Sequence, residues 1–233
     1  EIMDFFEALE GLRTPLAGPP VSAPENVVSV LLGLSLPEIS YSGKLNNSST
    51  SNGVWQSPPS VQAWETFQVE LNRVKPLLED RYFKQKFPTP SWHTRQLSGE
   101  VDLCGYFNET VGELFRMIFG PKAFTKGPSS GNLQPDFLLE IDDDVYLPIE
   151  FKTRATLPEK FTNFCKYYNE KKGKFDNSGI SRVTKQIYNY MMCRKVRFGV
   201  LSSVEMTFFF KVNDEGTLFV SKAISQKDMN FFL

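Results

Sequence analysis

Two neighbouring apolar runs, residues 136–141 and 145–152, constrain the fold of this chain more than any other feature. Apolar and polar positions alternate in the second run, and one set of side chains would share a face: Val145, Leu147, Ile149 and Phe151. A period of two is typical of a β-strand, so Glu150 and Lys152 would point together to the opposite face. The acidic residues 142–144 between the runs are typical of solvated residues in a hairpin turn.

The polar ends of these two predicted strands carry groups suited to hydrolytic chemistry. Asp136 opens the first run, where it would meet Glu150 and Lys152 at the end of the second. Two carboxylates can hold a hard divalent cation, and a lysine beside that cation can orient and help deprotonate a water molecule. These groups are the minimum that metal-dependent phosphodiester hydrolysis needs.

The spacing of these residues follows a known pattern. Pro135-Asp136, then thirteen residues, then Glu150-Phe151-Lys152 resembles the motif of the PD-(D/E)xK nuclease superfamily. Downstream, Gln186 and Tyr190 form a Q-x-x-x-Y pattern similar to that of its RecB-type branch, and upstream the run 108–115 looks like its first acidic helix. The resemblance covers roughly residues 100–220 and is carried by short motifs.

The resemblance implies an α/β fold, in which helices flank a central mixed β-sheet in a restriction-endonuclease-like core. We expect that core at residues 96–233. Residues 1–95 are expected to form a helical extension, with a mobile loop rich in Ser, Asn and Pro at 40–60.

The resemblance also implies a role for each motif residue. Asp136 and Glu150 would bind Mg²⁺ or Mn²⁺ with the Phe151 carbonyl, and Glu109 would serve a second ion, with Glu113 as the alternative. Lys152 would activate the attacking water. Gln186 would hydrogen-bond the water, the lysine or a phosphate, and Tyr190 would contact nucleic acid, more often DNA than RNA. The pKa of Lys152 stays open, because burial and a metal lower it while two carboxylates raise it.

Two other classes of function remain open. The scaffold also suits a catalytically inactive module that binds nucleic acid or a protein partner, since a site can decay while its fold persists. A carrier or ligand-binding domain is the third class, and a homodimer is compatible with each of them.

A basic segment follows the predicted metal strand, although the whole chain is nearly neutral with 26 basic and 27 acidic residues. Residues 152–186 hold nine basic residues against three acidic ones, which gives +6. Such a segment suits a phosphate backbone or a solvated helix and loop. The candidate nucleic-acid contacts here, besides Tyr190, are Lys171, Lys172, Lys174 and Arg182.

Composition excludes several other classes. The single histidine, His93, excludes paired-histidine nuclease chemistry, and the chain has no phosphate-binding glycine loop. Three widely spaced cysteines argue against a disulfide framework or structural zinc and favour a reducing, intracellular compartment, the nucleus included. No apolar run is long enough for a membrane span. The chain begins at Glu1, so a targeting segment cannot be assessed.

Further elements follow from periodicity and capping residues. Helices are expected at about 60–78, 106–119 and 181–194, and an aromatic, basic stretch at 157–172 favours another helix. Apolar runs predict strands at 196–201, 206–212 and 217–220, the last two joined by a turn at 213–216.

The basic segment yields a prediction about salt. If it binds a phosphate backbone, affinity for DNA or RNA falls by roughly 0.7 to 0.9 log units per log unit of salt for each phosphate neutralised. Reversing the charges of Lys171, Lys172 and Lys174 together should make that slope shallower and leave metal binding unchanged. Anisotropy of a labelled oligonucleotide, with Ca²⁺ replacing Mg²⁺ to prevent cleavage, measures the slope. Binding that ignores salt, or is absent at low salt, would contradict the prediction.

Overall fold

The computed structural model describes residues 25–26, 39–41, 56–73, 86–87, 95–127, 134–141, 144–157, 163–171, 179–203 and 205–225. Among these residues, no helix is both long enough and apolar enough to cross a membrane. The expected loop at 40–60 lies largely outside the described residues, as do Asp142 and Asp143 of the predicted turn.

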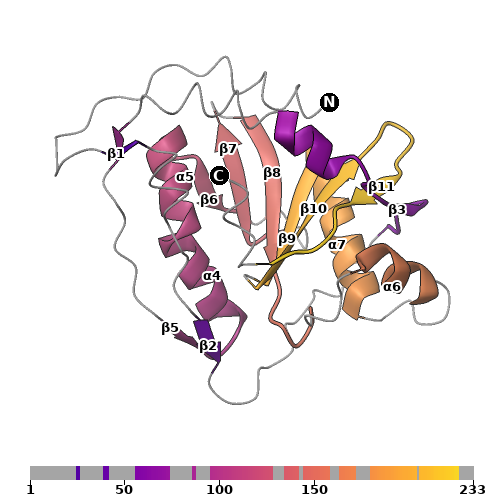
Figure 1. Cartoon of the computed structure of the whole chain (residues 1–233), viewed down its shortest axis with the longest axis horizontal. Coiled ribbons are helices and arrows are strands. Elements are labelled where there is room, and N and C mark those ends of the chain that lie inside the picture. Colours follow the sequence, from indigo (N-terminus) through magenta and orange to yellow (C-terminus); the bar gives the residue numbers. More distant parts are fainter. Residues whose placement is uncertain are drawn as a thin grey trace.

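A mixed β-sheet forms the centre of the molecule (Figure 1). Its strands, in spatial order, are β3 (Val61–Ala63), β11 (Leu218–Val220), β10 (Met206–Val212), β9 (Phe198–Ser202), β8 (Asp144–Phe151), β7 (Phe137–Ile141) and β6 (Phe124–Lys126). Strand β12 (Ile224–Ser225) also pairs with β10. The β8–β9 and β3–β11 pairs are parallel, and the other pairs are antiparallel. The predicted central mixed sheet is therefore confirmed.

Two small strand pairs lie outside this sheet. Strand β1 (Glu25–Asn26) pairs antiparallel with β4 (Lys86–Phe87), and β2 (Ile39–Tyr41) pairs parallel with β5 (Arg95–Leu97). The β2–β5 pair lies beside the start of helix α4, which spans Glu100–Glu109 (Figure 1).

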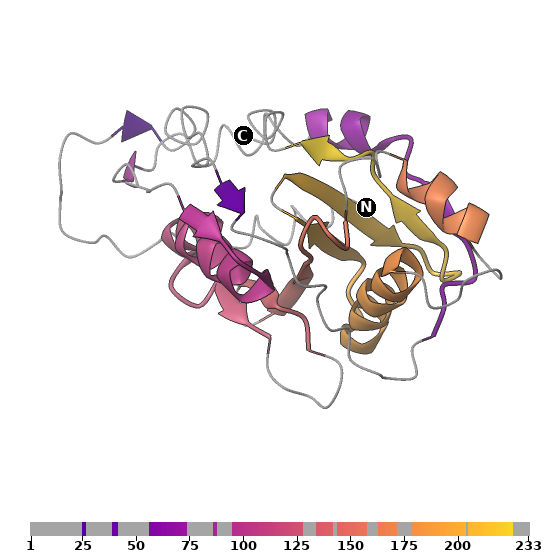
Figure 2. The same ribbon diagram turned by 90° about the horizontal axis from the view of Figure 1, so that it is seen from below.

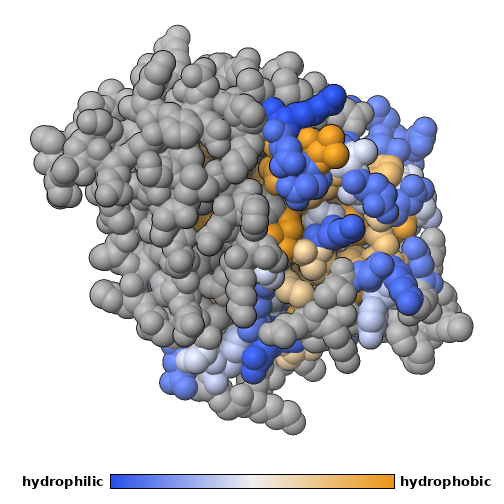
Figure 3. All heavy atoms as spheres, viewed as in Figure 1, coloured by the Kyte–Doolittle hydropathy of each residue, from blue (hydrophilic) through white to orange (hydrophobic). Residues whose placement is uncertain are grey.

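Helices cover both faces of the central sheet (Figures 1 and 2). They are α4 (Glu100–Glu109), α5 (Val111–Phe119), α6 (Phe164–Lys171) and α7 (Gly179–Arg194), and residues 67–73 are also helical. One apolar cluster joins α6 and α7 to β9, β10 and β11. A second joins α4 to β6, β7 and β8, and a third joins residues 64–71 to β9, β10, β11 and β12. On the face drawn in Figure 3, polar and apolar side chains of the described residues lie side by side. The exposed large apolar residues Val69, Val101 and Met192 come from three separate helices.

Strand β8 has the alternation that its sequence predicts. Ile149 and Phe151 are buried in the cluster beneath α4, where the Phe107 and Phe151 ring centroids lie 4.3 Å apart. Glu150 and Lys152 lie on the opposite face, with exposures of only 2% and 1%. Two ionisable side chains are thus buried on the face of the sheet that α7 covers.

The predicted helix at 106–119 is instead two helices. The first begins at Glu100, where the Ser98 backbone N–H donates to the Asp102 carboxylate. The break comes at Thr110, whose φ and ψ are −105° and −86° and whose hydroxyl donates to the Tyr106 carbonyl. A threonine that satisfies the last carbonyls of one helix ends that helix and lets the chain change direction.

The expected helix at 60–78 begins later than its sequence indicates. Residues 61–63 form the edge strand β3, because they find backbone partners on β11, and the helix begins at residue 67. Its apolar stripe does form a cluster, in which Trp64 and Phe67 pack edge to face at 5.0 Å. The segment predicted as an N-terminal extension therefore contributes a strand to the central sheet.

The C-terminal elements agree closely with their predicted bounds. Strand β10 spans the expected run, β9 and β11 start one or two residues later than predicted, and α7 starts two residues before Ser181. The turn between β10 and β11 is closed by a 3.0 Å hydrogen bond from Gly216 N to the Asn213 carbonyl. Gly216 has φ of 79°, a conformation that glycine adopts without strain.

The contact between α7 and β9 gives a testable prediction. A Cβ at Gly199 would lie 3.0 Å from the Met191 sulfur and 3.1 Å from Ile187 Cγ1. Gly199→Val should therefore lower the free energy of unfolding by about 1–3 kcal/mol, as overpacked core substitutions do. Gly179→Val is the matched control, since a Cβ there would lie 3.8 Å from Thr156, an ordinary contact. Urea unfolding measures both, and equal stabilities would contradict the close packing of α7 on the sheet.

Candidate active site

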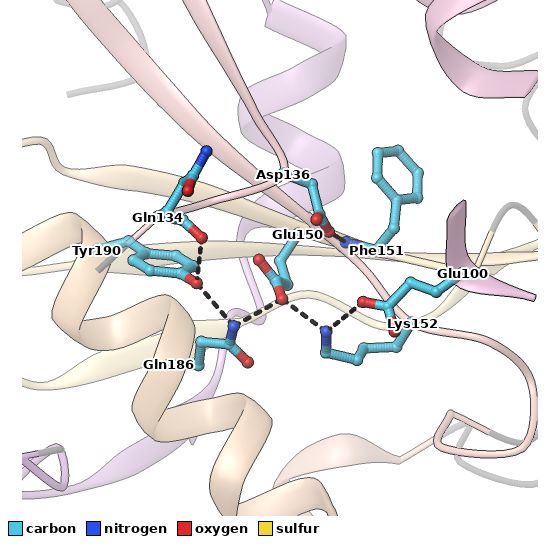
Figure 4. Close-up of polar contacts among 8 residues, drawn as sticks. All are labelled: Glu100, Gln134, Asp136, Glu150, Phe151, Lys152, Gln186 and Tyr190. Carbon is cyan, nitrogen blue, oxygen red and sulfur yellow. Dashed lines mark hydrogen bonds and ion pairs between the residues drawn. The ribbon is translucent and has the colours of Figure 1, made fainter. Parts of the chain in front are cut away.

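Three carboxylates from three separate elements meet at one end of the β7–β8 pair. Glu100 is the first residue of α4, Asp136 immediately precedes β7, and Glu150 lies in β8. One oxygen from each lies within 4.8 Å of the others (Figure 4). Glu150 forms the buried end of the group, whereas Glu100 and Asp136 are partly exposed.

Strand pairing places Asp136 next to Glu150. In the antiparallel register Phe137 faces Ile149, so the residue before β7 lies across from the residue after Ile149. The Phe151 backbone N–H donates to Asp136 Oδ2 at 2.7 Å. This bond extends the strand pairing by a side chain and holds the carboxylate at the site.

The two oxygens of Glu150 have different surroundings. Oε1 accepts hydrogen bonds from Lys152 Nζ at 2.6 Å and from Gln186 Nε2 at 2.7 Å. Oε2 is buried and has no hydrogen-bond partner among the described residues. A buried carboxylate oxygen without a partner is costly, and a bound cation would satisfy it.

Lys152 joins two of the carboxylates. Its ammonium group donates to Glu100 Oε1 at 2.7 Å as well as to Glu150. The side chain is 1% exposed, so these bonds lie away from the screening of water. The link connects the start of α4 with the end of β8.

A hydrogen-bonded chain continues from Glu150 to the opposite side of the site. Gln186 Nε2 also donates to the Tyr190 hydroxyl, which in turn donates to the Gln134 carbonyl, each at 2.7 Å (Figure 4). Gln186 and Tyr190 lie one turn apart on α7, as the sequence predicts. Tyr190 is 1% exposed. Its hydroxyl orients Gln186 and the residues before Asp136, so the nucleic-acid contact predicted for this side chain does not fit its position.

Burial and mutual repulsion raise the pKa values of the carboxylates. Burial is the main cause for Glu150, the charge of Asp136 adds to it, and together they raise its pKa to about 8 despite the nearby Lys152. The pKa values of Asp136 and Glu100 are also raised, again mainly by burial. The site thus resists holding three negative charges without a cation.

In the protein without metal, the surroundings of Lys152 raise its pKa. Burial alone lowers this pKa, but the charges of the three carboxylates and the hydrogen bond to Glu100 outweigh burial and raise it. Lys152 is therefore an ammonium ion at neutral pH. With all groups ionised, three carboxylates and one ammonium carry a net charge of −2, which one divalent cation would neutralise.

Other predicted site residues lie elsewhere. Glu109 ends the ten-residue helix α4, about two and a half turns after Glu100, and therefore points to the opposite side. Glu109 and Glu113 are both exposed, and the structure brings neither to the carboxylate group. Arg182 is exposed on α7, Lys171 ends α6, and Lys172 and Lys174 lie outside the described residues.

Glu100 is the site residue that sequence reasoning missed. The available signal was the pair of acidic residues, Glu100 and Asp102, in the first turn after Ser98-Gly99, a pattern that marks a helix start. Once the helix begins at residue 100, its first carboxylate faces the strand ends.

Comparison with known proteins adds no relative. A scan against protein-family models, a search of curated proteins and a search of solved structures each found no match.

The raised pKa of Glu150 predicts how stability depends on pH. The unfolded chain releases this proton at about pH 4.3, whereas the folded protein without metal keeps it until about pH 8. Stability is therefore fully present below the lower value and falls as pH rises between the two, by at most about 1.4 kcal/mol per pH unit.

Glu150→Gln should remove this fall, because the amide is neutral throughout. Urea unfolding in EDTA between pH 5 and 8 measures the difference from the wild type. Glu140→Gln on the neighbouring strand β7 is the matched control for loss of one carboxylate. Parallel pH profiles for wild type and Glu150→Gln would contradict a protonated, buried Glu150.

Proposed function

We propose that this chain is a metal-dependent nuclease that hydrolyses phosphodiester bonds in nucleic acid, DNA in preference to RNA, on a restriction-endonuclease-like core of the PD-(D/E)xK type. One observation carries the proposal. Three carboxylate oxygens lie within 4.8 Å of one another. The Glu150 carboxylate has one buried oxygen with no hydrogen-bond partner among the described residues, and the Lys152 ammonium lies 2.6 Å from its other oxygen.

The residues present suit Mg²⁺ or Mn²⁺. Glu100, Asp136 and Glu150 would hold the ion, since hard divalent cations prefer carboxylate oxygens. The bound ion supplies charge neutralisation at the phosphate and lowers the pKa of a bound water. Glu150 Oε2 could be one ligand atom, since no described residue donates a hydrogen bond to it.

Lys152 acts as a hydrogen-bond donor in this proposal. As an ammonium ion it has three N–H groups, and two donate to Glu100 and Glu150. The third can donate to the attacking water or to a phosphate oxygen, and so orient the reacting groups. Donors fixed before reaction stabilise the charge that develops in the transition state.

Gln186 supports the same geometry from α7. Its amide holds Glu150 Oε1 on one side and the Tyr190 hydroxyl on the other. Its own oxygen is buried and has no hydrogen-bond partner among the described residues. That oxygen can accept a hydrogen bond from a water molecule, which would help to position the water.

The order of the elements supports the assignment to the superfamily. An acidic helix precedes the Pro-Asp strand, the Glu-x-Lys strand follows it, and α7, with Gln186 and Tyr190, comes after α6. Strands β7, β8 and β9 are neighbours, so the antiparallel and parallel pairs meet at the strand that carries Glu150.

One paired measurement tests this function. Mn²⁺ should raise the thermal stability of the wild type, because an ion that binds only the folded state stabilises it by about 2.7 kcal/mol at 100 times its Kd. Asp136→Asn should lose most of that increment and all cleavage of labelled DNA. Lys152→Met should keep a metal response but lose cleavage by about 10²- to 10³-fold, the usual cost of removing a fixed donor that stabilises the transition state.

Lys211→Met is the matched control. This lysine is also largely buried and paired, 3.6 Å from Glu70, but it lies on β10 away from the carboxylates. Metal binding without any cleavage of DNA or RNA would favour the inactive module. Cleavage by Lys152→Met equal to that of the wild type, or an unchanged metal response in Asp136→Asn, would refute the proposed site.

A further inference from the structure

We infer that Arg154, stacked on Tyr41, is a binding residue for a backbone phosphate of the nucleic acid beside the carboxylate group. The inference rests on the proposed nuclease function and names a substrate contact for it. The Arg154 guanidinium carbon lies 4.6 Å from the centre of the Tyr41 ring. A cation over an aromatic face is attracted by the ring, so the side chain is held in one orientation.

The Arg154–Tyr41 stack lies beside the carboxylate group, because this stack and the Lys152–Glu100 ion pair link neighbouring residues of the chain. Arg154 follows Lys152 by two residues at the end of β8. Tyr41 pairs with Leu97 on β5, three residues before Glu100. The Lys152–Glu100 ion pair at 2.7 Å and the Arg154–Tyr41 stack therefore connect the same strand end to the same helix start.

A tight turn fixes the backbone at Arg154. The Thr156 and Leu157 N–H groups both donate to the Thr153 carbonyl, at 2.9 and 3.0 Å. Thr153 itself is 0% exposed. The turn begins directly after the catalytic strand, so the position of Arg154 is tied to that of Lys152.

The guanidinium remains available to a ligand. Its side chain is 51% exposed, and its nearest acidic partner, Glu205, is 3.8 Å away, which is too long for a hydrogen bond. Arg154 makes no hydrogen bond with any residue that the structure describes. The ring covers one face of the guanidinium, and its N–H edge can still donate.

A phosphate is the ligand that this arrangement suits. The fork of N–H groups on a guanidinium matches two phosphate oxygens, and such pairs combine charge attraction with a fixed geometry. The carboxylates next to it would repel a phosphodiester that approaches the site. A fixed positive charge at the edge offsets that repulsion and would position the strand for reaction.

Binding and cleavage of a labelled DNA oligonucleotide by four variants test this inference. With Ca²⁺ replacing Mg²⁺, Arg154→Ala should weaken binding about tenfold or more, as loss of a charged hydrogen bond does. It should also reduce the salt slope by about 0.7 to 0.9, the value for one phosphate. Arg154→Lys should recover the slope but only part of the affinity. Tyr41→Phe should match the wild type, and Tyr41→Leu should lose affinity.

Arg197→Ala is the matched control. Its side chain is 48% exposed and loses the same charge, but it pairs with Asp214 at 3.0 Å. It also precedes β9, at the opposite end of that strand from Ser202, the partner of Phe151. Equal effects of Arg154→Ala and Arg197→Ala on a protein that binds and cleaves DNA would overturn this inference alone. If the wild type binds neither DNA nor RNA at low salt, the nuclease proposal fails, and this contact fails with it.

Discussion

The buried carboxylate of Glu150 is the constraint on which the rest of the site depends. A group that is 2% exposed cannot be solvated by water, so the fold must supply donors and cations instead. Lys152 and Gln186 supply hydrogen bonds to one oxygen, and the other oxygen stays without a described partner. Burial, with the charge of Asp136 added to it, raises the pKa of Glu150, and the oxygen without a described partner is an atom that could bind a cation.

Sheet topology gathers the groups that meet this requirement. The antiparallel β7–β8 pair brings Asp136 across from Glu150, and the parallel β8–β9 pair allows α7 to cover the face on which Glu150 and Lys152 lie. The close approach of α7 at Gly199 is part of the same arrangement. A change that separates α7 from the sheet would therefore also move Gln186 away from Glu150.

Period-two patterns made the strands predictable, because alternation along β8 reports directly which side chains share a face. Sequence also paired Gln186 with Tyr190 correctly, since a spacing of four residues places them on one side of a helix. It failed where tertiary contacts outweigh local propensity. Residues 61–63 look like a helix start but pair with β11. The helix expected at residue 106 begins at Glu100, where the Ser98 N–H donates to the Asp102 carboxylate.

The sequence by itself determined the strand carrying Glu150 and Lys152, the alternation of its faces and the residue types that can hold a cation. Tertiary structure alone decided that Glu100, and not Glu109, joins the group, and that Tyr190 is buried as a hydrogen-bond partner. The reason is physical. Periodicity reports the direction of a side chain within one element, whereas the distance between carboxylates depends on how separate elements pack, which no local pattern encodes.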